Sequence, residues 1–148
     1  MRAFRDQIQF LFVYVMEAHA SDEWPLGNQR SCFEQHKTIE ARMEAAKHYR
    51  AVRMNAGLCA TDANILAASQ APFVCDTMQN SFYETFGAWP EGHILINTNH
   101  QLVVSTEAMH GSGQIKGGPW WKVIERALVE KLGLQKQNNT ERIHNVSS

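Results

Sequence analysis

The stretch from Ile8 to Trp24 constrains the fold of this chain more than any other. It opens with an apolar run, Ile8–Met16, that only Gln9 interrupts and that is rich in β-branched and aromatic residues. Such a run is too short to span a membrane and predicts a buried strand. Polar side chains follow it directly: Glu17, His19, Ser21, Asp22 and Glu23. Because ligands bind at the carboxyl ends of strands in open α/β sheets, this stretch predicts a functional site.

Length, charge and cysteine content narrow the class of protein. A chain of 148 residues predicts one domain with its own core, placed at 1–133, and a polar tail over 134–148 that is expected to be disordered. A net charge of −1 without a basic run argues against nucleic-acid or membrane-surface binding. No segment is typical of a signal peptide or a membrane span. Three irregularly spaced cysteines favour reduced thiols in the cytoplasm and predict no metal site.

Strands and helices are expected to alternate along the chain. A capping box of Ser31 and Glu34 starts the first helix. The expected elements are a strand at 8–16, helix 32–55, strand 73–75, helix 80–86, strands 93–97 and 101–105, and helix 120–132. Inward-facing residues at helical spacing are Phe33, His36, Ile39, Met43 and Ala46 in the first helix, and Trp121, Ile124, Leu128 and Val129 in the last. This order describes a thioredoxin-like α/β sandwich, with a mixed sheet of about four strands and flanking helices.

Several blocks of this sequence resemble the iodothyronine deiodinase family. Val13-Tyr14-Val15, followed by Glu17 to Asp22 and Trp24, is similar to the most distinctive segment of that family. His36 stands 17 positions after His19 (36 − 19), as the second histidine of the family stands after its first. Supporting blocks are Cys75 to Asn80, Trp89-Pro90-Glu91 and Gly118-Pro119-Trp120, so the resemblance covers about residues 8–132.

The resemblance implies reductive removal of iodine from an iodinated aromatic, thyroid-hormone-like substrate. The nucleophile of the family is a selenocysteine or cysteine at the N-terminus of a helix, where the pKa of a thiol is lowered. Iodine leaves as the aryl carbon gains a proton, so a proton source is required. The residues implied to carry out this chemistry are Glu17, His19 and His36, and those implied to contact the substrate are His19, Trp24, Trp89 and Pro90. The fold of the family also implies a cis Trp89–Pro90 bond.

The implied partners are the iodinated substrate and an external thiol reductant, with no bound cofactor, and the resemblance admits a homodimer. The sequence departs from the family pattern at three places. The strand–helix portion with the nucleophile is expected upstream of Met1, and a reading frame that begins just after a selenocysteine codon would explain its absence. The family has an arginine near the hairpin that binds the other end of the substrate, but this sequence has none between Arg53 and Arg126. Lys116 is the candidate for that role here. The connection at 54–70 is longer than usual for the family.

The same residues also fit purely structural roles, and two further functions remain open. Glu17 and His19 are also consistent with a solvated loop, His36 with a structural histidine, and Trp24 and Trp89 with core or rim aromatics. A general thiol oxidoreductase or peroxiredoxin-like protein would need a reactive cysteine. Cys32 is the strongest candidate for that cysteine, whereas Cys75 is predicted to be a buried thiol and Cys59 lies in an insert. A catalytically degenerate thioredoxin-fold module that binds aromatic ligands or a partner protein is the third candidate.

Overall fold

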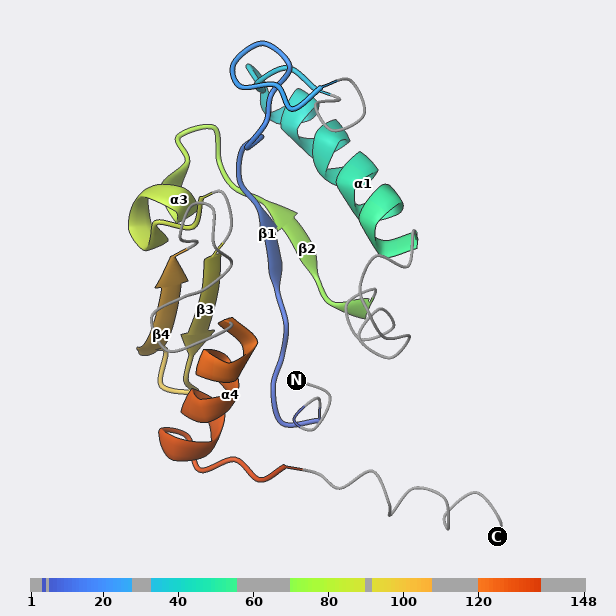
Figure 1. Cartoon of the computed structure of the whole chain (residues 1–148). Coiled ribbons are helices and arrows are strands. Elements are labelled where there is room, and N and C mark those ends of the chain that lie inside the picture. The colour runs from blue at the N-terminus through green and yellow to red at the C-terminus, as the bar shows by residue number, and fades with distance from the viewer. Residues whose placement is uncertain are drawn as a thin grey trace, which may run out of the picture.

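Four strands and three helices make up the part of the chain that the structure describes. The structure, a computed structural model, describes residues 4, 6–27, 33–55, 70–89, 92–107 and 120–136. The elements in chain order are β1 (Phe12–Tyr14), α1 (Ile39–Asn55), β2 (Phe73–Cys75), α3 (Ser81–Phe86), β3 (Gly92–Ile96), β4 (Leu102–Glu107) and α4 (Trp120–Glu130). Figure 1 shows the strands across the molecule in the order β4, β3, β1, β2, with β3 running opposite to the others. The predicted thioredoxin-like α/β order is confirmed.

Backbone hydrogen bonds join the strands as two pairs. β1 and β2 are parallel, with Phe12 opposite Phe73, and β3 and β4 are antiparallel. β1 covers only the centre of the run predicted as a strand. The Phe12 N–H donates to the Pro72 carbonyl at 2.9 Å and the Asp76 N–H to the Tyr14 carbonyl at 2.8 Å, which closes the ladder at both ends. Pro72 has no N–H to donate in return, so pairing stops there.

One hydrophobic core lies between α4 and the β3–β4 hairpin. Its buried residues are Phe4, Ile124 and Leu128, and the half-buried residues packed on them are Ile8, Leu95, Val104, Leu132 and Leu134. The inward positions predicted at Ile124 and Leu128 are confirmed, whereas Val129 is 40% exposed and that prediction is wrong. The chain turns back after α4, where the Leu134 N–H donates to the Leu128 carbonyl at 3.0 Å. Residues 137–148 of the predicted tail lie outside the described residues.

A second core lies between α1 and the β1–β2 pair. Tyr14, Ala45 and Ala46 are buried there, and the residues packed on them are Phe33, Phe73 and Cys75. The small side chains of Ala45 and Ala46 let α1 approach the strands closely. Ala46 was predicted inward and is confirmed, whereas Met43 is 46% exposed and that prediction is wrong.

The first helix begins at Ile39 and not near Cys32 as predicted. The hydroxyl of Thr38 accepts the Ala41 N–H at 3.2 Å, which makes Thr38 the cap. Residues 33–37 are instead held against the loop after β1, where the Ser21 N–H donates to the Phe33 carbonyl at 2.8 Å. Tertiary contacts therefore replace the first helical turns that the capping box favoured. Ser31 and Cys32 lie outside the described residues.

The β2–α3 junction and the hairpin follow the prediction closely. α3 lies where a short helix was expected, but its N-terminal amides are capped by Asp76, which accepts from Phe82 and Tyr83 at 2.9 and 3.0 Å. β3 begins at Gly92, where an added Cβ would lie 3.0 Å from the Ala88 Cα, so the connection from α3 requires glycine. Both hairpin strands lie within two residues of their predicted bounds.

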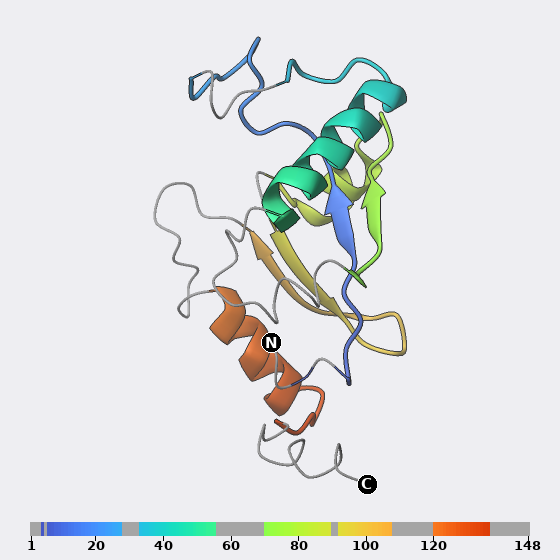
Figure 2. The same cartoon turned by 90° about the vertical axis from the view of Figure 1, so that its right-hand side faces the viewer.

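Both views place the loop after β1 at one end of the molecule and α4 toward the other (Figures 1 and 2). The carboxyl ends of β1 and β2 and the amino end of β3 share the edge that faces this loop (Figure 1). None of the helices in the described ranges combines the length and apolar character needed to cross a bilayer.

Candidate functional site

Three residues form a cluster where β1 ends, here called the Tyr14–Glu17–His36 cluster. The hydroxyl of Tyr14 donates to Glu17 Oε1 at 2.5 Å. The ring of His36 lies with its centroid 5.7 Å from that of Tyr14, tilted by 47°. The structure thus brings together two of the predicted catalytic residues, Glu17 and His36, and adds a third that sequence reasoning missed. This third residue is Tyr14. The sequence indicated it only as a tyrosine in a predicted buried strand, where the hydroxyl requires a hydrogen-bond partner.

Burial sets the protonation of Tyr14. Only 9% of the residue is exposed. Burial, together with the hydrogen bond to the Glu17 carboxylate, raises the pKa of Tyr14 far above its usual value, because a phenolate there would be poorly solvated and repelled by that carboxylate. Tyr14 therefore remains a proton donor to Glu17 throughout the neutral range.

His36 is a buried histidine whose ring lacks polar contacts among the described residues. It is 7% exposed, and neither Nδ1 nor Nε2 has a hydrogen-bond partner within the described ranges. Burial lowers the pKa of His36 below 6.5, the cation of Arg42 lowers it further, and the Glu17 carboxylate opposes both. The imidazole is therefore neutral at pH 7, and a neutral imidazole can accept a proton at one nitrogen and donate one from the other.

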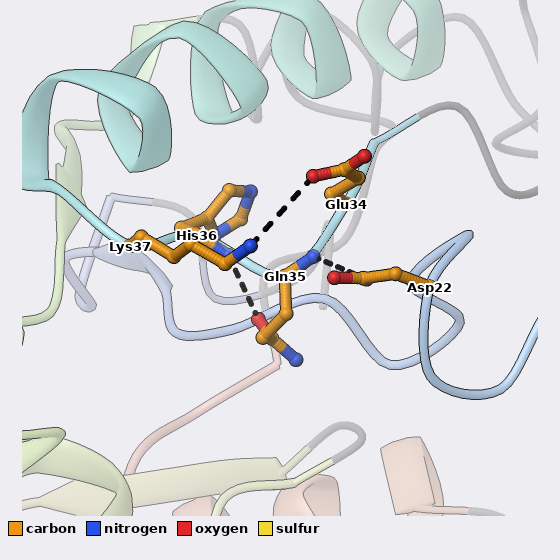
Figure 3. Close-up of polar contacts among 5 residues, drawn as sticks. All are labelled: Asp22, Glu34, Gln35, His36 and Lys37. Atoms are coloured by element: carbon orange, nitrogen blue, oxygen red, sulfur yellow. Dashed lines mark hydrogen bonds and ion pairs between the residues drawn. The ribbon is translucent and has the colours of Figure 1, made fainter.

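Gln35 joins the segment before α1 to the loop after β1. Its Oε1 accepts the Glu17 N–H at 3.3 Å, and its Nε2 donates to the Glu17 carbonyl at 3.1 Å and to Glu23 Oε2 at 3.2 Å. Its own backbone N–H donates to Asp22 Oδ1 at 2.7 Å (Figure 3). The sequence analysis predicted Gln35 to lie inside a helix, and that prediction gave no sign that its side chain would join two segments.

His19 lies apart from this cluster and faces Trp24. The two rings are 5.3 Å apart, and His19 Nδ1 lies 3.3 Å from the Trp24 carbonyl oxygen. Trp24 is 54% exposed and His19 is half-buried. The predicted substrate residues His19 and Trp24 therefore form one aromatic pair on the surface of the loop.

The remaining predicted site residues lie elsewhere. Trp89 is half-buried between α3 and β3, with its backbone N–H donating to the Gly87 carbonyl at 2.9 Å, and Pro90 lies outside the described residues. Cys75 in β2 is half-buried, and burial raises the pKa of its thiol while the Arg42 cation opposes the rise. A raised pKa keeps that thiol protonated and unreactive. Cys32 and Cys59 lie outside the described residues.

Arg42 connects α1 to the β2–α3 junction. Only 2% of it is exposed, and its guanidinium donates to the carbonyls of Asp76 and Thr77 and to Asn80 Oδ1, the last at 2.9 Å. Arg42 was not among the residues predicted to face inward, because that prediction took Phe33 and His36 as part of the same helix. Over the described ranges, no three His, Cys, Asp or Glu side chains gather in a metal-binding arrangement.

Comparison with known proteins adds independent information. A family model described as "Iodothyronine deiodinase" matches residues 1–111. Thyroxine 5-deiodinase of Ovis aries is 30% identical over 95 residues, covering 64% of this chain and 27% of the relative. Thyroxine 5-deiodinase of Homo sapiens is 32% identical over 88 residues (60% and 24%), and Type I iodothyronine deiodinase of Xenopus laevis is 31% identical over 88 residues (60% and 29%). The chain spans less than a third of the length of these relatives.

Proposed function

The chain belongs to the iodothyronine deiodinase family, and on that basis we propose that it forms the proton-handling side of a reductive dehalogenase. The observation that carries the proposal is the Tyr14–Glu17–His36 cluster at the carboxyl end of β1. The phenol of Tyr14 is hydrogen-bonded to the Glu17 carboxylate and packs against the neutral His36 ring. A carboxyl group and an imidazole are the side chains that most often transfer protons to a reacting atom. The nucleophile is a selenol or thiol carried by a segment that precedes these residues.

The reaction requires a proton and two electrons. The carbon–iodine bond of the aromatic substrate is replaced by a carbon–hydrogen bond, and iodide leaves. Two thiols of an external reductant supply the two electrons and become a disulfide, with one net proton released. We propose that Glu17 takes up one of the protons released as the two reductant thiols form their disulfide and, with His36, delivers it to the new carbon–hydrogen bond, while Tyr14 orients the Glu17 side chain through its 2.5 Å hydrogen bond.

We assign the aromatic substrate to the wall formed by His19 and Trp24. The two rings lie 5.3 Å apart, and Trp24 has half its surface free to stack on an iodinated ring. The amino end of β3 lies on the edge of the strands that also holds the end of β1 (Figure 1). Trp89 precedes β3 by three positions, and we propose that it also contacts the substrate.

The competing function, a general thiol oxidoreductase that uses a cysteine of this chain, has less support. Cys75 is held protonated by its surroundings, and thiolate is the reactive form. Both functions can be tested with one preparation, the protein expressed from its gene together with the nucleotides that precede the Met1 codon. Iodide release from thyroxine in the presence of a dithiol is compared with reduction of hydrogen peroxide by the same dithiol.

We expect dithiol-dependent iodide release that the Cys75→Ala variant retains. Peroxide reduction that falls with loss of a cysteine among residues 1–148, without iodide release, would favour the oxidoreductase. Binding of thyroxine, measured by quenching of tryptophan fluorescence, without either activity would favour the third candidate, a binding module.

A further inference from the structure

We propose that Gln35 is a positioning residue that sets His36 against Glu17 for the reaction. This inference rests on the proposed function for its catalytic consequence, whereas the geometry that it predicts can be measured without activity. Gln35 lies next to His36 in the chain, and its side-chain amide contacts both backbone polar groups of Glu17, the N–H and the carbonyl.

The two bonds from Gln35 to Glu17 fix the distance between two segments that are far apart in sequence. The amide oxygen accepts the Glu17 N–H and the amide nitrogen donates to the Glu17 carbonyl, at 3.3 and 3.1 Å across 18 positions. A planar amide that bonds to both backbone groups of one residue restrains its orientation as well as its distance. The same oxygen lies 3.4 Å from the His36 backbone N–H (Figure 3). One side-chain amide therefore contacts the backbones of both Glu17 and His36.

His36 depends on this restraint because its own ring makes no hydrogen bond within the described ranges. Its place is fixed by packing on Tyr14 and by the backbone that carries it. Two other hydrogen bonds hold the segment at earlier residues: Asp22 accepts the Gln35 N–H, and the Phe33 carbonyl accepts from Ser21. The Gln35 side chain contacts the backbone of His36 itself, so its loss removes a restraint on His36 and leaves these two bonds in place.

The charged and titratable groups around His36 come from three elements. Glu17 follows β1, Tyr14 lies in β1, and Arg42 lies in α1, one turn after its start. A ring that moves outward gains water and moves away from the Tyr14 ring. Its pKa then rises toward the ordinary value of about 6.5 as burial is relieved.

The test uses the 148-residue chain and the variant Gln35→Met, which keeps the length of the side chain and removes its hydrogen bonds. Proton NMR of the histidine rings follows the titration of His36 and the nuclear Overhauser contacts between the His36 and Tyr14 rings. We expect the titration midpoint of His36 to rise and the contacts to weaken at least twofold. The control is Lys37→Gln, which breaks the exposed Lys37–Glu34 ion pair of the same segment (Figure 3) and leaves both readouts unchanged.

A purely structural role would lower the melting temperature of Gln35→Met and leave the His36 midpoint and ring contacts of the folded protein as they are, which would overturn the proposal. If Gln35→Met does not fold, Gln35→Glu replaces it, since that variant keeps the acceptor oxygen and loses the donor. Its added carboxylate raises the pKa of His36 by itself, so only the ring contacts are then compared, and unchanged ring contacts would overturn the proposal. In the protein that carries the upstream nucleophile, Gln35→Met lowers kcat with little change in KM. Absence of activity in the unsubstituted protein would count against the proposed function and leave the NMR result standing.

Discussion

Asp76 gives the most quantitative prediction that the structure offers. Its carboxylate is 4% exposed and accepts three backbone N–H groups, from Thr77 at 2.7 Å, Phe82 at 2.9 Å and Tyr83 at 3.0 Å. Phe82 and Tyr83 are the second and third residues of α3, whose amides have no partner inside the helix. Asp76 is therefore the cap of α3 and the anchor of the β2–α3 junction.

The magnitude follows from the number of bonds lost. Each such bond contributes about 1 kcal/mol, so Asp76→Ala should lower the free energy of unfolding by about 3 kcal/mol. Asp76→Asn keeps the oxygen that Thr77 and Phe82 use and loses the Tyr83 bond, which costs about 1 kcal/mol. For a chain of this size, 1 kcal/mol corresponds to roughly 2–4 °C in melting temperature, so the two variants should melt roughly 6–12 °C and 2–4 °C below the parent chain.

The assay is thermal and urea unfolding of the 148-residue chain at pH 7, followed by far-ultraviolet circular dichroism. The matched pair separates the effect of hydrogen bonding from that of removing a charge, because Asn removes the charge and retains two bonds. Equal losses in the two variants, or a loss in Asp76→Ala below about 1 kcal/mol, would refute the assignment of Asp76 as the cap.

Two further predictions concern the Tyr14–Glu17–His36 cluster. Tyr14→Phe removes a hydrogen bond to a carboxylate and should lower the free energy of unfolding, measured by urea titration, by about 1.5 kcal/mol. The control is Tyr83→Phe, which should lower it less because the Tyr83 hydroxyl has no hydrogen bond to any described residue. Equal losses in the two variants would contradict the stabilising role of the Tyr14–Glu17 hydrogen bond. The pKa of His36 in the folded protein lies below its value of about 6.5 in the unfolded chain. Between these two pKa values the unfolded chain binds more protons than the folded protein. The free energy of unfolding therefore falls as the pH drops from about 6.5 toward the folded pKa. His36→Gln should flatten this part of the stability–pH curve, and an unchanged slope in that variant would show that His36 is not buried in its neutral form.

The sequence predicted the elements of this fold better than it predicted their ends. β2 was predicted with its observed bounds, because Pro72 and Asp76 limit a short apolar run. β1 was predicted too long, since an apolar run shows burial but not where its partner strand ends. Ile8 in that run packs on α4 and belongs to no strand.

The start of α1 shows why local signals failed near the site. The capping box at Ser31 and Glu34 favours a helix from that point, but the segment from 33 to 37 is held by contacts with residues 17–23. Those contacts lie more than ten positions away in sequence and leave no periodic pattern. The predicted inward face was set partly by Phe33 and His36, which precede the observed helix, and it missed the buried Arg42 and included the exposed Met43.

The candidate site was predicted only in part, again because its contacts join segments that lie far apart in sequence. Glu17 and His36 were identified from their place after a strand and from the family resemblance, and the structure places both beside Tyr14. Gln35 and Tyr14 have ordinary surroundings in the sequence, so only the tertiary structure shows their contacts. His19 was predicted to take part in catalysis and, with Trp24, to contact the substrate, and its ring lies against Trp24.

The proton-delivery role of Glu17 is tested most directly by the rate of dithiol-dependent iodide release. The protein expressed with the proposed upstream selenol or thiol is compared with its Glu17→Gln variant. Gln still accepts the Tyr14 hydrogen bond and fills the same space, but it cannot deliver a proton. We expect kcat to fall by about 100-fold or more while thyroxine binding is retained, as for loss of a general acid. Iodide release at the parental rate in Glu17→Gln would remove the Tyr14–Glu17–His36 cluster from the chemistry.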